Sequence, residues 1–243
     1  MRPKKLRTIG ILGGMGPEAT GAFFDLIVRN TLVRRDQDHV PVMIYSLPQV
    51  PDRTEAILHG GPSPLPRLRR GLVILHRAGA DFAVVPCLSA HHFLPALAAR
   101  SPLPLISLTE ETVAEVKKRR PRLTRIGLLA TTGTIRSRLF HDALEASGIE
   151  VLCPGPRDQR RVMNAIYGRS GIKAGASPDR SRRTLRSVAA GLVRHGAQAV
   201  IAGCTEVPLV LERGDLAVPL IDPMRAGALA CIRRAGGRIR QER

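Results

Sequence analysis

The sequence contains an internal repeat with a constant offset of 117 residues. The segment "TIGILGGMG" falls on "RIGLLATTG" in the second half, so that Ile9 and Gly10 align with Ile126 and Gly127 without a gap. Under the same offset "RAGADFAVVPC" falls on "RHGAQAVIAGC", and a cysteine ends each segment. A repeat of this kind predicts a chain built from two units of similar plan.

Short apolar runs alternate with amphipathic segments in both halves, a pattern typical of βαβ units with a parallel sheet. The fold class that we predict is therefore α/β, with an N-terminal domain over residues 1–102 plus 220–243 and a C-terminal domain over 103–219. The expected helices of the first half are Thr20–Arg34, Leu65–Ala78, Ser89–Arg100 and Glu110–Arg119. Those of the second half are Arg136–Ser147, Arg157–Tyr167, Asp179–His195 and Met224–Ala235.

Charge and apolar content restrict the function classes. The net charge of +18 favours nucleic acid at first sight, but only five of the 38 basic residues are Lys, and the chain has two Tyr, five Phe and no Trp to stack on bases. We therefore expect an Arg-rich solvated surface that attracts anionic substrates, and no nucleic-acid partner. No apolar run has the ~18 residues of a membrane span, and no signal peptide is recognisable, so we expect a soluble, cytoplasmic protein without a membrane partner.

The four cysteines show no CxxC pair and no zinc-finger spacing, which argues against a bound metal or a disulfide framework. Cys153 and Cys231 have no cysteine partner under the 117-residue offset and are interpreted as structural. Cys87 and Cys204 coincide in the repeat, each just after an apolar strand and before a helix. In α/β sheets this end of the strands is where ligands bind, and a helix N-terminus there lowers a thiol pKa.

Two thiols in equivalent positions, without metal spacing, point to proton transfer on both faces of one carbon. In such a reaction one thiolate removes a proton from an sp3 centre, and the opposite thiol returns a proton to the other face. Arg53 and Lys173 lie on corresponding loops of the two halves and could hold a substrate carboxylate. Both residues also allow an interpretation without a binding role, in which Arg53 caps a turn with Asp52 and Lys173 is a surface residue.

Seven segments, taken in order and with their spacing, carry a resemblance to a known family: "ILGGMGPEAT", "PDRT", "VPCLSAHH", "LLATTGT", "IYGRSGIKAG", "GCTEVPLVL" and "PLIDP". The chain resembles the cofactor-independent aspartate/glutamate racemases of the aspartate/glutamate/hydantoin racemase superfamily, and most of all the aspartate racemases. The resemblance extends from about Thr8 to Ala235. It implies two pseudo-symmetric Rossmann-like domains, an active site in the cleft between them, a homodimer, no cofactor and a small amino-acid substrate.

The resemblance also implies roles for individual residues. The catalytic cysteines match Cys87 and Cys204, while Arg53 and Lys173 match the cations that hold the substrate carboxylates. Residues that match the floor of the cleft are Ser89, Thr131, Thr132 and Thr205. The substrate-binding residues that we predict further include Met15, Thr54, Leu88 and Glu206.

One position departs from the family pattern. The family usually has Asn directly after the first cysteine, where this chain has Leu88, and loss of a hydrogen-bonding side chain can change substrate discrimination by orders of magnitude. A sibling activity of the superfamily (isomerase, decarboxylase or hydantoin racemase) and a non-catalytic protein that binds an anionic ligand are the alternatives. His91 matches a family histidine, and a packing role and a catalytic role are both open for it.

Overall fold

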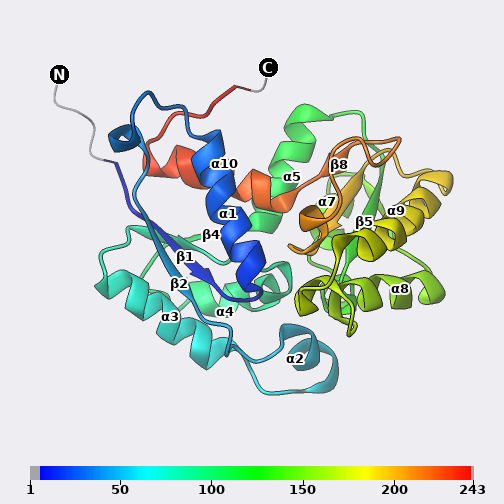
Figure 1. Ribbon diagram of the computed structural model, residues 1–243, viewed down its shortest axis with the longest axis horizontal. Coiled ribbons are helices and arrows are strands. Elements are labelled where there is room, and N and C mark those ends of the chain that lie inside the picture. The colour runs from blue at the N-terminus through cyan, green and yellow to red at the C-terminus, as the bar shows by residue number, and fades with distance from the viewer. Residues whose placement is uncertain (1–5, 242–243) are drawn as a thin grey trace. The chain divides into compact units, whose positions relative to one another are not determined.

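The computed structural model describes residues 6–241, and the chain divides into two compact units (Figure 1). Unit 1 contains the N-terminal part up to Pro51, Ser63–Glu111 and the C-terminal part from Met224 onwards. Unit 2 contains Asp52–Pro62 and Thr112–Pro223. The short segment Asp52–Pro62 therefore packs with unit 2, although both of its sequence neighbours belong to unit 1.

Unit 1 is built on a parallel four-stranded sheet with the order β2-β1-β3-β4. The strands are β1 (Ile9–Gly13), β2 (Val42–Ser46), β3 (Phe82–Val84) and β4 (Leu105–Ile106). Every residue of β1 and β3 is buried, whereas β2 is partly exposed, because the two inner strands are covered on both faces and the edge strands are not. The most apolar runs of this half therefore become the centre of its sheet.

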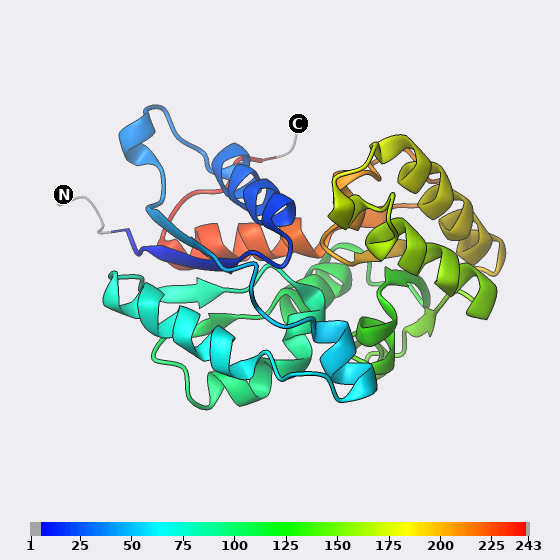
Figure 2. The same cartoon turned by 60° about the horizontal axis from the view of Figure 1, so that its bottom comes forward.

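Helices cover both faces of this sheet, as right-handed crossover connections require (Figure 2). Helices α1 and α10 lie on one face, and α3 and α4 lie on the other (Figure 1). The helices are α1 (Pro17–Asn30), α3 (Leu65–Arg77), α4 (Leu94–Ala98) and α10 (Pro223–Ala235), with the 3-10 turns η1 (Asp36–Asp38) and η2 (Leu88–Phe93). Helix α5 (Leu108–Arg119) begins in unit 1 and continues in unit 2.

Unit 2 has a second parallel four-stranded sheet with the equivalent order β6-β5-β7-β8. Its strands are β5 (Arg125–Ala130), β6 (Glu150–Leu152), β7 (Val200–Gly203) and β8 (Leu220–Ile221). Its helices are α2 (Arg53–His59), α6 (Thr132–Arg136), α7 (His141–Glu145), α8 (Pro156–Tyr167) and α9 (Pro178–Arg194), with η3 (Ile172–Ala174) and η4 (Val207–Leu209).

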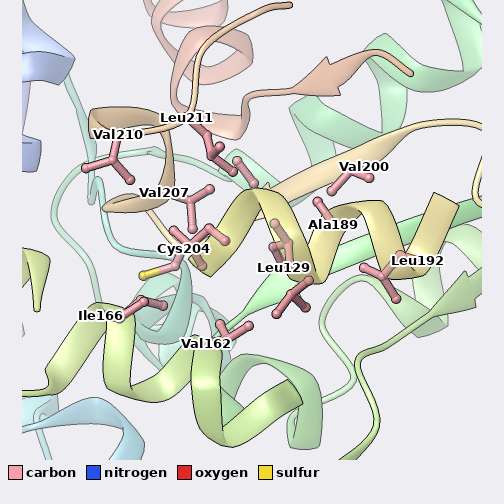
Figure 3. Packing of buried hydrophobic residues seen from close by; sticks show 14 of the residues in the cluster. Leu129, Val162, Ile166, Ala189, Leu192, Val200, Cys204, Val207, Val210 and Leu211 are labelled. Carbon is pink, nitrogen blue, oxygen red and sulfur yellow. The ribbon is translucent and has the colours of Figure 1, made fainter. Parts of the chain in front are cut away.

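The core of unit 2 lies between its sheet and helices α8 and α9. Leu129 of β5 and Val200 of β7 pack there against Val162 and Leu185 of the two helices. Cys204 belongs to the same cluster, and Figure 3 shows its sulfur pointing away from Leu192, toward the end of the cluster near Ile166. The thiol is thus held by a packed core while its sulfur lies at the border of that core.

The expected α/β fold with two similar units is confirmed by the identical strand orders of the two sheets. The gapless offset, however, is wrong beyond the inner strands. It relates β1 to β5 and β3 to β7, but β2 begins at residue 42 and β6 at residue 150, which are 108 positions apart rather than 117. Unit 2 has a shorter connection before its second strand and a longer one after it, with α8 and α9 in the place of α3.

Two expected helices differ in detail. The segment expected as one helix over Ser89–Arg100 is a 3-10 turn followed by the short helix α4. The segment expected over Arg136–Ser147 is divided into α6 and α7, because Arg138 has a φ of 56°, in the left-handed region that ends a right-handed helix. None of the helices within residues 6–241 is both long and apolar enough to cross a membrane.

Candidate active site

Cys87 lies in unit 1, three residues beyond the last residue of β3. It is the residue from which η2 begins, and its side chain is buried. The backbone N–H of Ala90 donates to its carbonyl at 3.1 Å and closes the first turn of η2. The chain therefore changes from strand to turn at this residue, at the carboxyl end of an inner strand, as the sequence predicts.

His91 fixes the backbone around Cys87. Its Nδ1 donates to the carbonyl of Cys87 at 2.9 Å, while its Nε2 accepts the backbone N–H of Leu108 at 2.9 Å. These partners determine the tautomer, because only a ring with its proton on Nδ1 satisfies both. Burial lowers the pKa of His91 from 6.5 to about 4. Both nitrogens are engaged by backbone groups, so the structure supports the packing role for this histidine.

The glycine-rich loop after β1 is closed by its own side chains. Thr20 Oγ1 accepts the N–H of Gly14 at 2.9 Å and donates to the carbonyl of Gly16 at 2.8 Å. Gly14 has a φ of 96°, and a Cβ there would lie 2.4 Å from the backbone carbon of Leu47, so only glycine fits. The predicted site residues of unit 1 are all buried: Met15, Cys87, Leu88 and Ser89.

Cys204 lies in unit 2, directly after the last residue of β7. The strand approaches β5 closely at this point, since a Cβ on Gly203 would lie 2.5 Å from Leu128 Cδ1. The N–H of Val207 donates to the carbonyl of Cys204 at 3.0 Å and starts η4. Thr205 is buried beside the cysteine, with 2% of its surface exposed.

Glu206 connects the predicted residues of unit 2. One of its carboxylate oxygens, Oε2, accepts from Cys204 Sγ at 2.8 Å and from Thr205 Oγ1 at 3.1 Å. The other, Oε1, accepts from Lys173 Nζ at 2.5 Å. A carboxylate that is 97% buried is costly unless it is paired, and these three donors offset that cost. Lys173 is thus part of an ion pair and not a free surface residue.

The surroundings of Cys204 favour its protonated thiol form over the thiolate. Burial and then the negative charge of Glu206 raise its pKa well above the ordinary value, while Lys173 acts in the opposite direction. Lys173 Nζ also lies 5.6 Å from the centre of the Tyr167 ring. Burial raises the pKa of Tyr167 as well, and the charges of Asp52, Cys204 and Arg53 act on its hydroxyl.

Helix α2 brings Arg53 to unit 2. Its N-cap is Asp52, which accepts the N–H of Glu55 at 2.9 Å, so Asp52 and not Arg53 performs the capping. Tyr167 Oη donates to the other oxygen of Asp52 at 3.0 Å. Thr54 lies against α6, where a Cβ on Gly133 would be 3.0 Å from its hydroxyl. Arg53 itself is 93% buried.

Thr131 and Thr132 begin helix α6. Thr131 Oγ1 is the N-cap acceptor for the N–H of Thr134 at 3.3 Å. Thr132 accepts from Gln159 Nε2 at 3.2 Å, and the same amide donates to the carbonyl of Ala130 at 3.0 Å. The two threonines therefore fix the loop after β5. Within residues 6–241, no three His, Cys, Asp or Glu side chains are grouped so that they could hold a metal ion.

Comparison with known proteins adds to this geometry. The model of the Asp/Glu/hydantoin racemase family matches residues 12–231, which is nearly the whole chain. The chain belongs to this family. The broad specificity amino-acid racemase RacX of Bacillus subtilis is 27% identical over 218 residues, which cover 88% of this chain and 92% of RacX.

Solved structures of racemases share the fold of this family member. The aspartate racemase of Picrophilus torridus is 30% identical with a TM-score of 0.86, and the match covers 96% of each chain. A putative Asp/Glu racemase from Yersinia pestis is 27% identical with a TM-score of 0.78, covering 95% of this chain and 99% of that one. The resemblance inferred from the seven sequence segments is thus confirmed at the level of the family.

In this racemase-family chain the predicted site residues form two groups. Unit 2 connects Cys204, Thr205, Glu206 and Lys173 through hydrogen bonds and an ion pair. Sequence reasoning missed Tyr167, although it lies inside the quoted segment "IYGRSGIKAG". It also gave Glu206 only a substrate-binding role, because sequence spacing does not reveal that one carboxylate contacts both the cysteine and the lysine.

Proposed function

We propose that this protein is a pyridoxal-independent amino-acid racemase in which Cys87 and Cys204 act on opposite faces of one α-carbon. One sulfur takes the α-proton as the C–H bond breaks, and the other sulfur gives its proton to the carbanion on the opposite face. The product is the enantiomer of the substrate. Arg53 and Lys173 bind the substrate carboxylates and stabilise the carbanion electrostatically.

The observation that supports this proposal most is the equivalent position of the two cysteines in two units of equal topology. Each follows an inner strand of its sheet and precedes a 3-10 turn, and each side chain is buried. Core filling by chance does not explain the same residue type at the same place twice. Membership of the racemase family supports the same reading.

The substrate range that we propose is aspartate, glutamate or a related amino acid. Both predicted carboxylate-binding cations, Arg53 and Lys173, belong to unit 2, which suits a substrate with two carboxylates. Leu88 is 99% buried and offers no hydrogen bond where the family usually has Asn. A relative of 27% identity is described as having broad specificity, so neutral amino acids belong in the test.

The experiment is a circular-dichroism assay of purified protein with L-aspartate, L-glutamate and a panel of neutral L-amino acids, without pyridoxal phosphate. We expect loss of the optical signal with at least one substrate, and incorporation of one solvent deuterium at its α-carbon. Complete inactivity across acidic and neutral substrates would exclude this function. We also propose a cytoplasmic homodimer, and light scattering coupled to gel filtration tests the dimer.

A sibling activity of the superfamily is the second candidate, and the Leu88 substitution favours it. An enzyme that uses Cys87 as a covalent nucleophile would form an adduct of increased intact mass with its substrate. A proton-transfer enzyme would form none and would exchange the α-hydrogen. Mass spectrometry of the protein after incubation with substrate therefore separates the two candidates.

A further inference from the structure

The carboxylate of Glu206, which the sequence predicts to bind substrate, contacts other residues of the protein itself. It is 97% buried, it touches the sulfur of Cys204 at 2.8 Å, and its other oxygen lies 2.5 Å from Lys173 Nζ. Thr205 Oγ1 supplies a third donor. Three donors from three residues use most of the roughly four lone-pair sites of the carboxylate, so the geometry points to a role toward the enzyme's own residues.

We propose that Glu206 is a positioning residue that keeps Cys204 in its thiol form and holds Lys173 at rest until a substrate carboxylate takes Lys173 over. The inference rests on the proposed racemase function for its place in the reaction. The control of Cys204 protonation by the Glu206 carboxylate, however, involves residues of unit 2 alone.

Two side chains act on this sulfur. Glu206 lies on the loop that carries Cys204 itself, and Lys173 comes from η3. The charge of Cys204 in turn acts on the Tyr167 hydroxyl of α8, as do Arg53 of α2 and its N-cap residue Asp52. Of these, only Glu206 accepts a hydrogen bond from the sulfur, and an accepted hydrogen bond stabilises the form that carries the proton. Lys173 opposes it by charge.

The consequence for the reaction is an inequality between the two thiols. Cys204 begins a turnover as the proton donor: its S–H bond breaks as the new C–H bond forms, and the thiolate left behind faces the Glu206 carboxylate. Two adjacent anions repel each other, which favours rapid return of a proton to Cys204 from solvent. In the same turnover the Cys87 thiolate removes the α-proton: the C–H bond of the substrate breaks as an S–H bond forms on Cys87. Release of this proton to solvent restores the Cys87 thiolate and balances the proton that Cys204 takes up.

The experiment measures the thiol directly and does not depend on catalysis. The rate of alkylation of Cys204 by iodoacetamide is followed against pH, by mass spectrometry of the peptide that contains it. In Glu206→Gln the midpoint should move to lower pH by about one unit or more, which makes alkylation below the midpoint ~10-fold faster. In Lys173→Met it should move to higher pH.

We expect the alkylation midpoint of Cys204 to shift in opposite directions in the two variants. A general loosening of the fold would instead shift the midpoints of both variants in the same direction. Cys153 serves as the internal control, since its midpoint should be equal in all variants. Glu212→Gln, an exposed substitution eight residues beyond Cys204, is the matched control variant. Glu206→Asp, which retains the charge, should bring the midpoint back toward that of the parent protein.

An unchanged Cys204 midpoint in Glu206→Gln would overturn the inference even if the enzyme racemises amino acids. Conversely, the predicted shifts in a protein without racemase activity would support the control of Cys204 by Glu206 while the proposed function fails. The two hypotheses are thus tested separately by one set of variants.

Discussion

The two cysteines occupy equivalent places in the two units, yet their surroundings differ in kind. Around Cys87 the contacts are between backbone and a neutral imidazole, with His91 joining the Cys87 carbonyl to the N-terminus of α5. Around Cys204 they are ionic, with Glu206 between the sulfur and Lys173. The comparison teaches that duplication fixes where a side chain leaves the sheet, whereas the neighbouring loops set its charge environment.

The largest effect should come from removing either thiol. Cys87→Ser and Cys204→Ser should each lower kcat by about 1,000-fold, since positioned acid–base groups contribute factors of this order. Cys153→Ser is the control and should retain activity, because burial raises the pKa of that thiol to about 11 and keeps it unreactive. Racemisation rates measured by circular dichroism decide the matter. Equal activity of all three variants would contradict a two-thiol mechanism.

The second largest effect should come from removing Lys173, the cation that is paired with Glu206 near Cys204. Lys173→Met should reduce kcat/KM by roughly 100-fold, because a charge-assisted contact to the substrate carboxylate is lost and the buried Glu206 carboxylate loses its ion pair. Arg169→Met, on the exposed part of the same loop, is the matched control and should stay within a factor of about two of the parent. Steady-state kinetics with the substrate found in the optical assay make the comparison.

The buried neutral His91 beside Cys87 predicts that the stability of the protein depends on pH. Its pKa is lowered in the folded state from 6.5 to about 4, so between these values the unfolded chain binds the additional proton and the fold loses stability as the pH falls. At pH 5 this amounts to about 2 kcal/mol relative to neutral pH. His91→Gln should lack this component, although its stability at pH 7 is lower. Urea unfolding at pH 7 and pH 5 measures both differences, and an equal pH dependence would argue against the buried neutral imidazole.

The smallest effect concerns the hydrogen bond that attaches α2 to unit 2. Tyr167→Phe removes the donor to Asp52 and should lower the free energy of unfolding by about 1 kcal/mol. If α2 carries Arg53 into the site, KM should also rise while kcat changes little. Thermal unfolding and kinetics test the two parts. A drop in kcat with unchanged KM would instead assign the hydroxyl a direct part in the chemistry.

Much of the fold was predictable because its inner strands are continuous apolar runs. Ile9–Gly13 and Val200–Gly203 are buried along their whole length, and their repeat in the sequence predicted two similar units. The edge strands were less predictable, since β2 and β6 are partly exposed and need no continuous apolar pattern. The offset therefore held for the inner strands and failed for the outer ones.

The sequence by itself determined the positions of Cys87 and Cys204, because a strand-to-turn transition is a local property that apolar runs and glycines specify. Only the tertiary structure decided that α2 packs on α6 within unit 2, through the contact of Thr54 with Gly133 and the hydrogen bond of Tyr167 to Asp52. It also decided that Glu206 joins Cys204 to Lys173 across 33 residues of sequence. Such contacts depend on the geometry of close packing between distant segments, and residue spacing along the chain does not encode that geometry in a readable form.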